Sequence, residues 1–470
     1  MATVVRRPRG LPERTVELVS FDMVVRGGRV VGRDGVAEAD VGIVDGRVAA
    51  LGRGLDGRTR VDAGGAYVLP GLVDPHVHPI HAETYGSVSE AALHGGVTTT
   101  LHHLYTPPDA DPVAFAEAEI DVAGAETRTD FAFHVRLNDL RRTGPRIAAL
   151  AERGHTSVKL FMAYGGRGIM LDDQELLVAL AAASEAGVTV LIHAENGHLS
   201  DHLEHDARAR GATSLSEYYA SRHRWIEVDA VERVLRMLRG VPCSTYLVHL
   251  TCAESLEAVA AAKLAGLPVV AETCPHYLLL TADEAAPLGA RAKMAPPLRD
   301  ARDRDVLWSG LRAGIVDTVG SDHSAFVRGE KETSDDVFEA GFGVPGIATM
   351  LPLLFDRGVS TGRIGIERLV DSLATAPARR LGLGGRKGSL AVGCDADLVL
   401  FDPDASFTLD ATSERGNGYY SLYEGWSGRG RVRAVYLRGR LALEDDRLVA
   451  EPGLGRFLRR VAAPRVAVPT

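Results

Sequence analysis

The stretch VLPGLVDPHVHP, residues 68–79, says most about the fold of this chain. It is a run of apolar residues that ends on two histidines, His76 and His78, with one residue between them. Alternate residues of an extended strand point to the same side, so a strand with this ending directs both imidazoles at one point. Neutral imidazole is the commonest metal ligand. The pair therefore predicts a metal site, although two unrelated strand-end histidines would give the same pattern.

Seven more apolar strands follow this one, and segments rich in Ala, Leu and Glu separate them. We expect the eight strands at 68–76, 97–103, 130–137, 156–162, 188–193, 244–250, 268–274 and 315–322. We expect helices between them that include 173–187, 229–239, 253–265 and 302–313. Continuous apolar strands that alternate with helices are typical of an α/β fold with a (β/α)8, TIM-like barrel, whose parallel strands are buried on both faces.

The segment between the fifth and sixth expected strands, roughly 195–228, is long and polar. Long polar connections at the mouth of a barrel often carry function. We expect a loop here that covers the barrel mouth. A crossover with a solvated surface would have the same composition.

Both ends of the chain have a different pattern, with short strands separated by Gly turns. The pattern runs through residues 21–67 and returns from 393 to 449. Two such pieces can fold together as one unit. We therefore expect a small composite β-sandwich domain built from residues 1–67 and 386–470, with the barrel domain, residues 68–385, inserted between its two halves.

Composition and charge limit the classes of function. A chain of 470 residues can bury a large core, and its net charge of −9 argues against binding to nucleic acid or to an anionic membrane. The four cysteines have no CxxC spacing, which favours reduced thiols in the cytoplasm. The N-terminal segment contains arginines but no apolar run, and no run of 18 apolar residues occurs, so we expect neither a signal peptide nor a transmembrane helix.

Residue types that bind metal ions recur at the ends of the expected strands. The residues concerned lie at or near the C-terminal ends of five strands, and they are His76, His78, Lys159, His193, His249 and Asp322. Barrel enzymes carry their active sites at these strand ends. Each residue also has an ordinary explanation, since a buried histidine can be hydrogen-bonded in the core, Asp322 can cap a helix and Lys159 can extend to the surface. Their agreement across five strands favours one shared site.

The positions of the other histidines do not indicate a shared metal site. We expect them to be structural or solvated, and they include His102, His103, His134, His155, His198, His276 and His323. His323 alone directly follows a candidate ligand, Asp322.

Lys159 is unusual among these candidates because a cation would repel bound metals. Two divalent ions about 5 Å from an ammonium group, at an effective dielectric constant of about 20, would each repel it by roughly 7 kcal/mol. A neutral lysine that reacts with carbon dioxide to form a carbamate would instead supply two anionic oxygens. If two metals are present, the electrostatics favour this modified form.

The chain resembles the amidohydrolase superfamily, and within it the dihydropyrimidinase, hydantoinase and allantoinase group. The resemblance runs from about residue 21 to 460. The motifs that carry it, in chain order, are PGLVDPHVH, GGVTT, SVKLFMAY, IHAEN, VHL, ETCPHYL, APPLRD, GSDH, RKGSLAVGCDADLVLFDP and SLYEG. Their combination and order make the resemblance specific.

The resemblance implies a centre of two divalent metal ions, usually zinc, in a homotetrameric enzyme. His76, His78 and Asp322 would hold one ion, and His193 and His249 would hold the other. Lys159, as N6-carboxylysine, and a hydroxide would bridge the two ions. Nitrogen and oxygen ligands without thiolate suit zinc, manganese or cobalt at a hydrolytic site.

The resemblance also implies a reaction, in which the bridging hydroxide attacks the carbonyl of a cyclic amide. The product would be a ring-opened N-carbamoyl amino acid or ureido acid. Tyr164 would donate a hydrogen bond to the developing oxyanion. Asp322 would take the proton of the attacking hydroxide and pass it to the leaving nitrogen.

The substrate-binding positions depart from the hydantoinase pattern. Ala295 stands where hydantoinases usually have a substrate-binding serine, and Pro345 stands where they tend to have asparagine; both resemble allantoinases more. The segment HHLYTPPD, residues 102–109, matches neither group. Pro79 and Ile80 follow the histidine pair, whereas dihydroorotases usually have an arginine there.

The favoured hypothesis is thus a metal-dependent cyclic amidohydrolase that acts on hydantoin-like or dihydropyrimidine-type rings. An allantoinase that converts allantoin to allantoate is the alternative, and a dihydroorotase is less favoured. A non-catalytic scaffold of the same fold is disfavoured because scaffold relatives have lost several ligands, whereas this chain retains all six. A deaminase with a single metal is disfavoured because such sites usually lack the lysine at Lys159.

Overall fold

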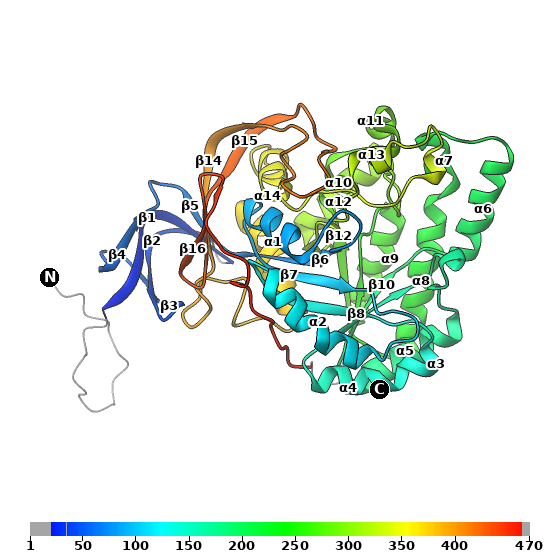
Figure 1. Cartoon of the computed structure of the whole chain (residues 1–470), viewed down its shortest axis with the longest axis horizontal. Coiled ribbons are helices and arrows are strands. Elements are labelled where there is room, and N and C mark those ends of the chain that lie inside the picture. The colour runs from blue at the N-terminus through cyan, green and yellow to red at the C-terminus, as the bar shows by residue number, and fades with distance from the viewer. Residues whose placement is uncertain (1–19, 34, 463–470) are drawn as a thin grey trace.

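The computed structural model describes residues 20–33 and 35–462, and it has two parts, a barrel surrounded by helices and a β-sheet beside it (Figure 1). Eight parallel strands form the barrel in chain order. They are β6 (Leu72–Val77), β7 (Val97–Leu104), β8 (Asp130–Arg136), β9 (Ser157–Phe161), β10 (Thr189–His193), β11 (Thr245–Leu247), β12 (Val269–Thr273) and β13 (Thr318–Val319). A parallel bridge between Val77 and His323 connects the first strand to the segment after the last. The expected (β/α)8 barrel is confirmed.

Alternation along the strands directs one set of side chains into the barrel and the other set toward the helices. In β10, Leu191 belongs to a buried cluster with Leu101, Ala132 and Tyr246 from other barrel strands. Its neighbours Val190 and Ile192 belong to a separate cluster with residues of the surrounding helices. Because strand residues are buried on both sides, the sequence shows continuous apolar runs rather than alternation.

Helices lie on the outside of the barrel (Figure 1). The longer ones are α1 (Tyr85–His94), α2 (Pro112–Glu126), α5 (Asp173–Ala186), α6 (Gly197–Ala209), α8 (Arg224–Gly240), α9 (Ala253–Leu264) and α12 (Ala301–Ala313). The shorter ones are α3 (Leu140–Thr143), α4 (Ile147–Glu152), α7 (Leu215–Ser221), α10 (Pro275–Leu279), α11 (Ala282–Ala285), α13 (Arg328–Lys331), α14 (Met350–Leu354), α15 (Ile366–Val370) and α16 (Ala376–Arg380). The four helices expected from the sequence are all present, although α8 begins five residues before the expected 229.

The prediction of a loop at 195–228 is wrong, because this segment forms α6, α7 and the start of α8. Asn196 caps α6 through its side chain, and Ser214 forms a capping box with Glu217 at the start of α7. The polarity of the segment reflects the solvent-facing side of amphipathic helices, and the capping residues were the signal that would have revealed them.

The second part is a sheet made from both ends of the chain. Its strand order is β17 (Arg447–Leu448), β16 (Arg440–Glu444), β15 (Ser427–Leu437), β14 (Leu398–Thr408), β5 (Tyr67–Pro70), β1 (Phe21–Gly32), β2 (Gly35–Val44) and β3 (Arg47–Gly52), and β4 (Gly57–Asp62) also pairs with β1. The antiparallel pair of β14 and β5 joins the C-terminal strands to the N-terminal ones, as expected. The expected strand 68–76 is therefore two strands, because β5 belongs to this sheet and β6 to the barrel.

A buried ionic cluster connects the two parts. The Lys387 Nζ lies 2.5 Å from an oxygen of Asp130, the first residue of β8, and 2.9 and 2.7 Å from oxygens of Asp395 and Asp397. Arg438, in the turn between β15 and β16, pairs with the same Asp130. Since a buried charge requires partners, this cluster fixes the terminal sheet against the bottom of the barrel.

Candidate active site

All six candidate ligands line one cavity of about 350 Å³ at the C-terminal ends of the barrel strands, and Tyr164 and Ala295 line it too. The other lining residues are Ile80, His81, Tyr105, Arg136, Phe161, Arg167, Ile169, Met294, Ser324, Phe342, Gly343 and Val344. Pro345 follows Val344 in the chain and does not line the cavity. No described residue of the segment 195–228 lines it either, so other loops form its wall.

His76, His78 and Asp322 form one group of potential ligands in this cavity. Asp322 Oδ1 lies 3.1 Å from the Nε2 of His76 and 3.0 Å from the Nε2 of His78. Burial lowers the pKa of His78 to about 4, so this imidazole is neutral, the form that can bind a metal ion. Burial alone would raise the pKa of Asp322, but the nearby histidines outweigh that effect and hold it well below its usual range.

His193 and His249 form a second group. The Nδ1 of His193 lies 2.9 Å from the Nε2 of His249. Burial lowers the pKa of both imidazoles, His249 well below its ordinary value. The ring centres of His249 and His76 lie 5.5 Å apart, so the two groups are neighbours in the cavity.

Three of the four histidines are held at their other nitrogen. The Nδ1 of His76 lies 2.6 Å from Glu272 Oε1, and the Nδ1 of His78 lies 2.7 Å from the Tyr105 hydroxyl. The Nε2 of His193 lies 2.8 Å from Glu195 Oε2. Metal-binding histidines are usually held in this way, because the partner fixes the tautomer and aims the remaining lone pair.

Glu272 and Glu195 are themselves buried and fixed. Glu272 also accepts hydrogen bonds from the Tyr246 hydroxyl and from the backbone of His249. Glu195 accepts a hydrogen bond of 2.9 Å from the buried Arg222. Although burial opposes ionisation, Arg222 and His193 lower the pKa of Glu195 to about 2, so it remains a carboxylate.

The donor set fits metal ions. The Nε2 of His76 is buried, and its 3.1 Å approach to Asp322 does not have hydrogen-bond geometry, so it makes no hydrogen bond to any described residue. The facing atoms lie 2.9 to 3.1 Å apart, and two ligand atoms at tetrahedral angles around a zinc ion are separated by roughly 3.3 Å. A small outward movement would therefore admit an ion at each group.

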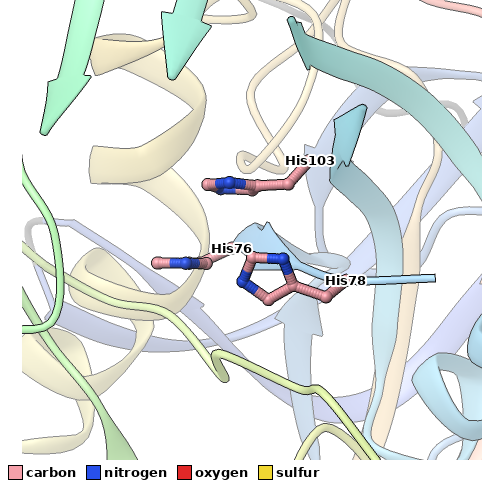
Figure 2. Close-up of side chains that lie close together, drawn as sticks. All are labelled: His76, His78 and His103. Carbon is pink, nitrogen blue, oxygen red and sulfur yellow. The ribbon is translucent and has the colours of Figure 1, made fainter. Parts of the chain in front are cut away.

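His103 of β7 lies beside the first group but is not a fourth ligand to it. Its ring stacks on that of His76 with centres 4.4 Å apart and planes at 8° (Figure 2). An imidazole lone pair lies in the plane of its ring, so two parallel stacked rings cannot direct their lone pairs at one ion. Neither ring nitrogen of His103 has a hydrogen-bond partner among the described residues.

Lys159 is buried between the two neighbouring strands β8 and β10. Its Cα pairs with Arg136 on one side and with Leu191 on the other. Burial lowers the pKa of its ammonium group to about 8. No hydrogen bond or ion pair holds its Nζ within the described part of the chain, and this atom lies 5.0 Å from the centre of the Phe161 ring.

Three candidate residues have a left-handed backbone, a conformation that side chains other than glycine seldom adopt. Their φ angles are 70° for Tyr164, 42° for His249 and 49° for Asp322. Such conformations cost about 1–3 kcal/mol each and cluster at functional sites. The ring centre of Tyr164 lies 4.9 Å from that of His193, and burial raises the pKa of the Tyr164 phenol well above its ordinary value, so the phenol keeps its proton.

Sequence reasoning missed the partners of the histidines. Glu195 lies two residues after His193, and Glu272 is the one charged residue in the strand VVAET, so alternation and polarity offered a signal for both. Tyr105 and Arg136 had no comparable signal, because nothing in their local pattern indicates that they line the cavity.

Comparisons with known proteins bear on this site. Residues 67–442 match the amidohydrolase family. The chain is 37% identical to the D-hydantoinase of Ralstonia pickettii over 455 residues, which cover 94% of this chain and 99% of that protein. It is 38% identical to the allantoinase of Rubrobacter xylanophilus over 451 residues, which cover 94% and 98%. A solved dihydropyrimidinase from Brevibacillus agri superposes with a TM-score of 0.90 at 32% identity and covers 94% of this chain and 100% of its own.

These similarities include the barrel, the terminal sheet and every strand end that lines the cavity. The family match begins at β5 and ends within β16, so it spans the parts of both chain ends that pair with each other. The chain belongs to the amidohydrolase family.

Proposed function

We propose that this protein is a metal-dependent hydrolase that opens a cyclic amide, of the hydantoin or dihydropyrimidine type, to an N-carbamoyl amino acid. The observation that carries the proposal is the convergence of four histidines, one ionised aspartate and one buried lysine on a single cavity. The hydantoinase and dihydropyrimidinase relatives support the reaction class.

His76, His78 and Asp322 would hold one divalent ion, and His193 and His249 would hold another. The nitrogen and oxygen donors suit zinc. Bound there, the ions would lower the pKa of water and polarise an amide carbonyl. Lys159 supports a bridging role, because its pKa of about 8 leaves roughly a tenth of it neutral at pH 7. A neutral Nζ can add to carbon dioxide and lose one proton to solvent, which gives a carbamate, N6-carboxylysine. Its two oxygens would serve as ligands for the two ions.

The remaining steps belong to residues of the chain. Tyr164 keeps its phenol proton and would donate it in a hydrogen bond to the carbonyl oxygen as negative charge develops there. Asp322 is ionised and would take a proton from the attacking water and deliver it to the leaving ring nitrogen. Ala295 lines the cavity and would contact the ring, whereas Pro345 would act through its neighbour Val344.

Allantoin is the second candidate ring. The allantoinase of Rubrobacter xylanophilus is as similar to this chain as the hydantoinases are, and the small Ala295 side chain lines the cavity. Allantoin is a hydantoin with a ureido substituent, so the same ring opening would give allantoate.

The experiment is a ring-opening assay on the zinc-loaded protein with hydantoin, dihydrouracil, allantoin and dihydroorotate. We expect turnover of at least one of the first three, its loss when a chelator removes the metal, and its return when zinc is restored. A fully loaded protein that opens none of these rings, or turnover that survives complete removal of metal, would refute the proposal.

We further propose a cytoplasmic homotetramer with a composite domain of residues 1–67 and 386–470 and a catalytic domain of residues 68–385. All four cysteines lie among the described residues, and each is a buried free thiol, which supports a reducing compartment. No helix among the described residues is long and apolar enough to cross a membrane. Sedimentation equilibrium tests the tetramer.

A further inference from the structure

The wall of the catalytic cavity carries more positive than negative side chains. Besides the candidate ligands it contains two arginines, Arg136 and Arg167, whereas its one carboxylate is Asp322, which already faces two histidines. Arginine is always charged, so this part of the cavity remains cationic at any physiological pH.

Arg136 lies at the level of the candidate ligands. It is the last residue of β8, and its Cα pairs with that of Lys159 in β9. Paired residues of neighbouring strands are about 4.8 Å apart and point to the same side of the sheet. The Arg136 guanidinium carbon lies 4.9 Å from the centre of the Tyr105 ring, whose hydroxyl contacts His78. A small ring bound at the ligand cluster is therefore within reach of this guanidinium.

Arg136 has no acidic partner among the described residues. It is half-buried, and its Nη2 donates a 3.0 Å hydrogen bond to the carbonyl oxygen of Thr106. Its Nε is buried without a hydrogen-bond partner among the described residues. Of the five N–H groups on the guanidinium, one is therefore bonded to the protein. Burial lowers the pKa of Arg136 because its charge is incompletely compensated.

A purely structural role does not explain this arrangement. The Thr106 carbonyl also accepts a hydrogen bond of 3.2 Å from the side chain of Asn138, so it does not depend on Arg136. Lys293 and Lys331 are two other buried cations near the cavity, and neither pairs with an acidic residue in the part of the chain that the structure describes. Each donates to two backbone carbonyls. Arg136, by contrast, retains unused donors beside the cavity.

Arg167 adds a second cation nearer the entrance. It is exposed, and its guanidinium carbon lies 4.7 Å from the centre of the Phe342 ring and 5.6 Å from that of Tyr164. No acidic residue of the described chain pairs with it. A cavity lined by one sign of charge attracts ligands of the opposite sign.

We propose that the cavity selects a cyclic amide that carries an anionic substituent of the carboxylate class, with Arg136 binding the anion and Arg167 attracting it to the entrance. The inference rests on the proposed function and narrows its substrate. Arginine suits the role because its planar fork matches the two oxygens of a carboxylate. The bond also supplies the negative partner that Arg136 lacks in the free protein.

The test compares substrates that differ only in charge. Hydantoin-5-acetic acid and hydantoin-5-acetamide form one pair, and dihydroorotate and its amide form a second pair on another ring. For the zinc-loaded protein we expect kcat/KM for the acid to exceed that for the amide by roughly 10- to 100-fold on the ring that is opened. Raising the salt concentration should reduce this ratio.

Arg136→Gln retains a donor for the Thr106 carbonyl but removes the charge. We expect it to reduce the acid-to-amide ratio of kcat/KM to near one, mainly by raising KM for the acid, and Arg136→Lys to restore part of the ratio. Arg142→Gln is the matched control, because exposed Arg142 donates to carbonyls of the same loop, those of Pro108 and Ala110, without lining the cavity.

The outcomes separate the inference from the function on which it rests. If the wild-type protein opens the amide as well as or better than the acid, or if Arg136→Gln reduces both to the same extent, the inference is wrong while the ring-opening function stands. If neither member of either pair is opened, nor any neutral ring of the first assay, the proposed function fails. The acid-to-amide ratio of kcat/KM for the wild-type protein tests the inference even if the Arg136→Gln variant does not fold.

Discussion

At the scale of single residues, the site depends on groups that have opposite requirements for charge. The histidines must be neutral to offer lone pairs, Asp322 and Glu195 must be ionised, and Tyr164 must keep its proton. Burial lowers the pKa of His78, His193 and His249 and raises that of Tyr164. Neighbouring cationic groups keep the pKa of Asp322 and Glu195 low. Lys159 is the one group that the environment leaves between two states, with a pKa of about 8.

Lys159→Ala tests the bridging role. We expect the metal content measured by elemental analysis to fall from about two ions per chain to one or fewer, and ring opening to fall by about 10³-fold or more, because the bridge and its negative charge are lost. His198→Ala, at an exposed histidine of α6, should change neither quantity. A fully active Lys159→Ala protein would instead support a site with a single metal.

Glu272→Gln tests the support of His76 and His249. The substitution keeps the shape but removes the carboxylate that lies 2.6 Å from His76 Nδ1. We expect metal affinity, measured by chelator competition, to weaken by roughly 10- to 100-fold. Glu257→Gln on the exposed face of α9 is the matched control. Equal affinity in both variants would contradict the role given to Glu272.

At the scale of secondary-structure elements, the sequence predicted what depends on local pattern. Each of the eight barrel strands contains an apolar run, so the strands were found to within a few residues. The polar helices α6 and α7 were missed because polarity was given more weight than the capping residues Asn196 and Ser214. The contacts of Tyr105 and Arg136 were not predictable, because they depend on how loops from different strands meet above the barrel.

Asp172→Ala tests how α5 begins. The Asp172 side chain accepts a hydrogen bond from the backbone N–H of Glu175, and the Glu175 side chain accepts one from the backbone N–H of Asp172. Loss of the cap should reduce the free energy of unfolding by about 1 kcal/mol, measured by urea denaturation. Asp173→Ala, one residue into the helix, should have a smaller effect, and a reversed order would contradict the assignment of the cap.

His102 in β7 makes the stability of the fold depend on pH. Burial lowers its pKa to about 3, whereas an unfolded histidine titrates near 6.5. Between these values the unfolded chain binds the extra proton, so stability is lost as the pH falls below 6.5. From pH 7 to pH 5 this residue should account for about 2 kcal/mol of the loss, because each pH unit below 6.5 contributes about 1.4 kcal/mol.

His102→Gln should therefore lose less stability between pH 7 and pH 5 than the wild-type protein, in urea denaturation at the two values. His198→Gln, exposed on α6, is the control and should behave as the wild type does. An identical pH dependence in the wild type and His102→Gln would show that His102 is not buried as a neutral group.

At the scale of the whole molecule, the barrel and the terminal sheet are tied together by charge as well as by strand pairing. Lys387 is enclosed by Asp130, Asp395 and Asp397, which come from both parts of the fold. The motif RKGSLAVGCDADLVLFDP contains three of these four residues, so the sequence resemblance included the cluster without indicating what it does.

Lys387→Met leaves buried carboxylates without their cation. We expect the free energy of unfolding to fall by about 3–5 kcal/mol, which is typical when one partner of a buried ion pair is removed. Arg236→Met removes an exposed partner of Glu232 and should cost about 0–1 kcal/mol. Comparable losses in the two variants would contradict the role of the cluster as the joint between the two parts.

The central claim is that two metal ions lie among side chains from five barrel strands. Anomalous diffraction at the zinc edge, from crystals of protein produced with zinc, tests it most directly. We predict two peaks in the cavity, one among His76, His78 and Asp322 and one between His193 and His249, with carbamate density on the Lys159 Nζ. No peak in the cavity, or a single peak beside an unmodified Lys159, would contradict the account.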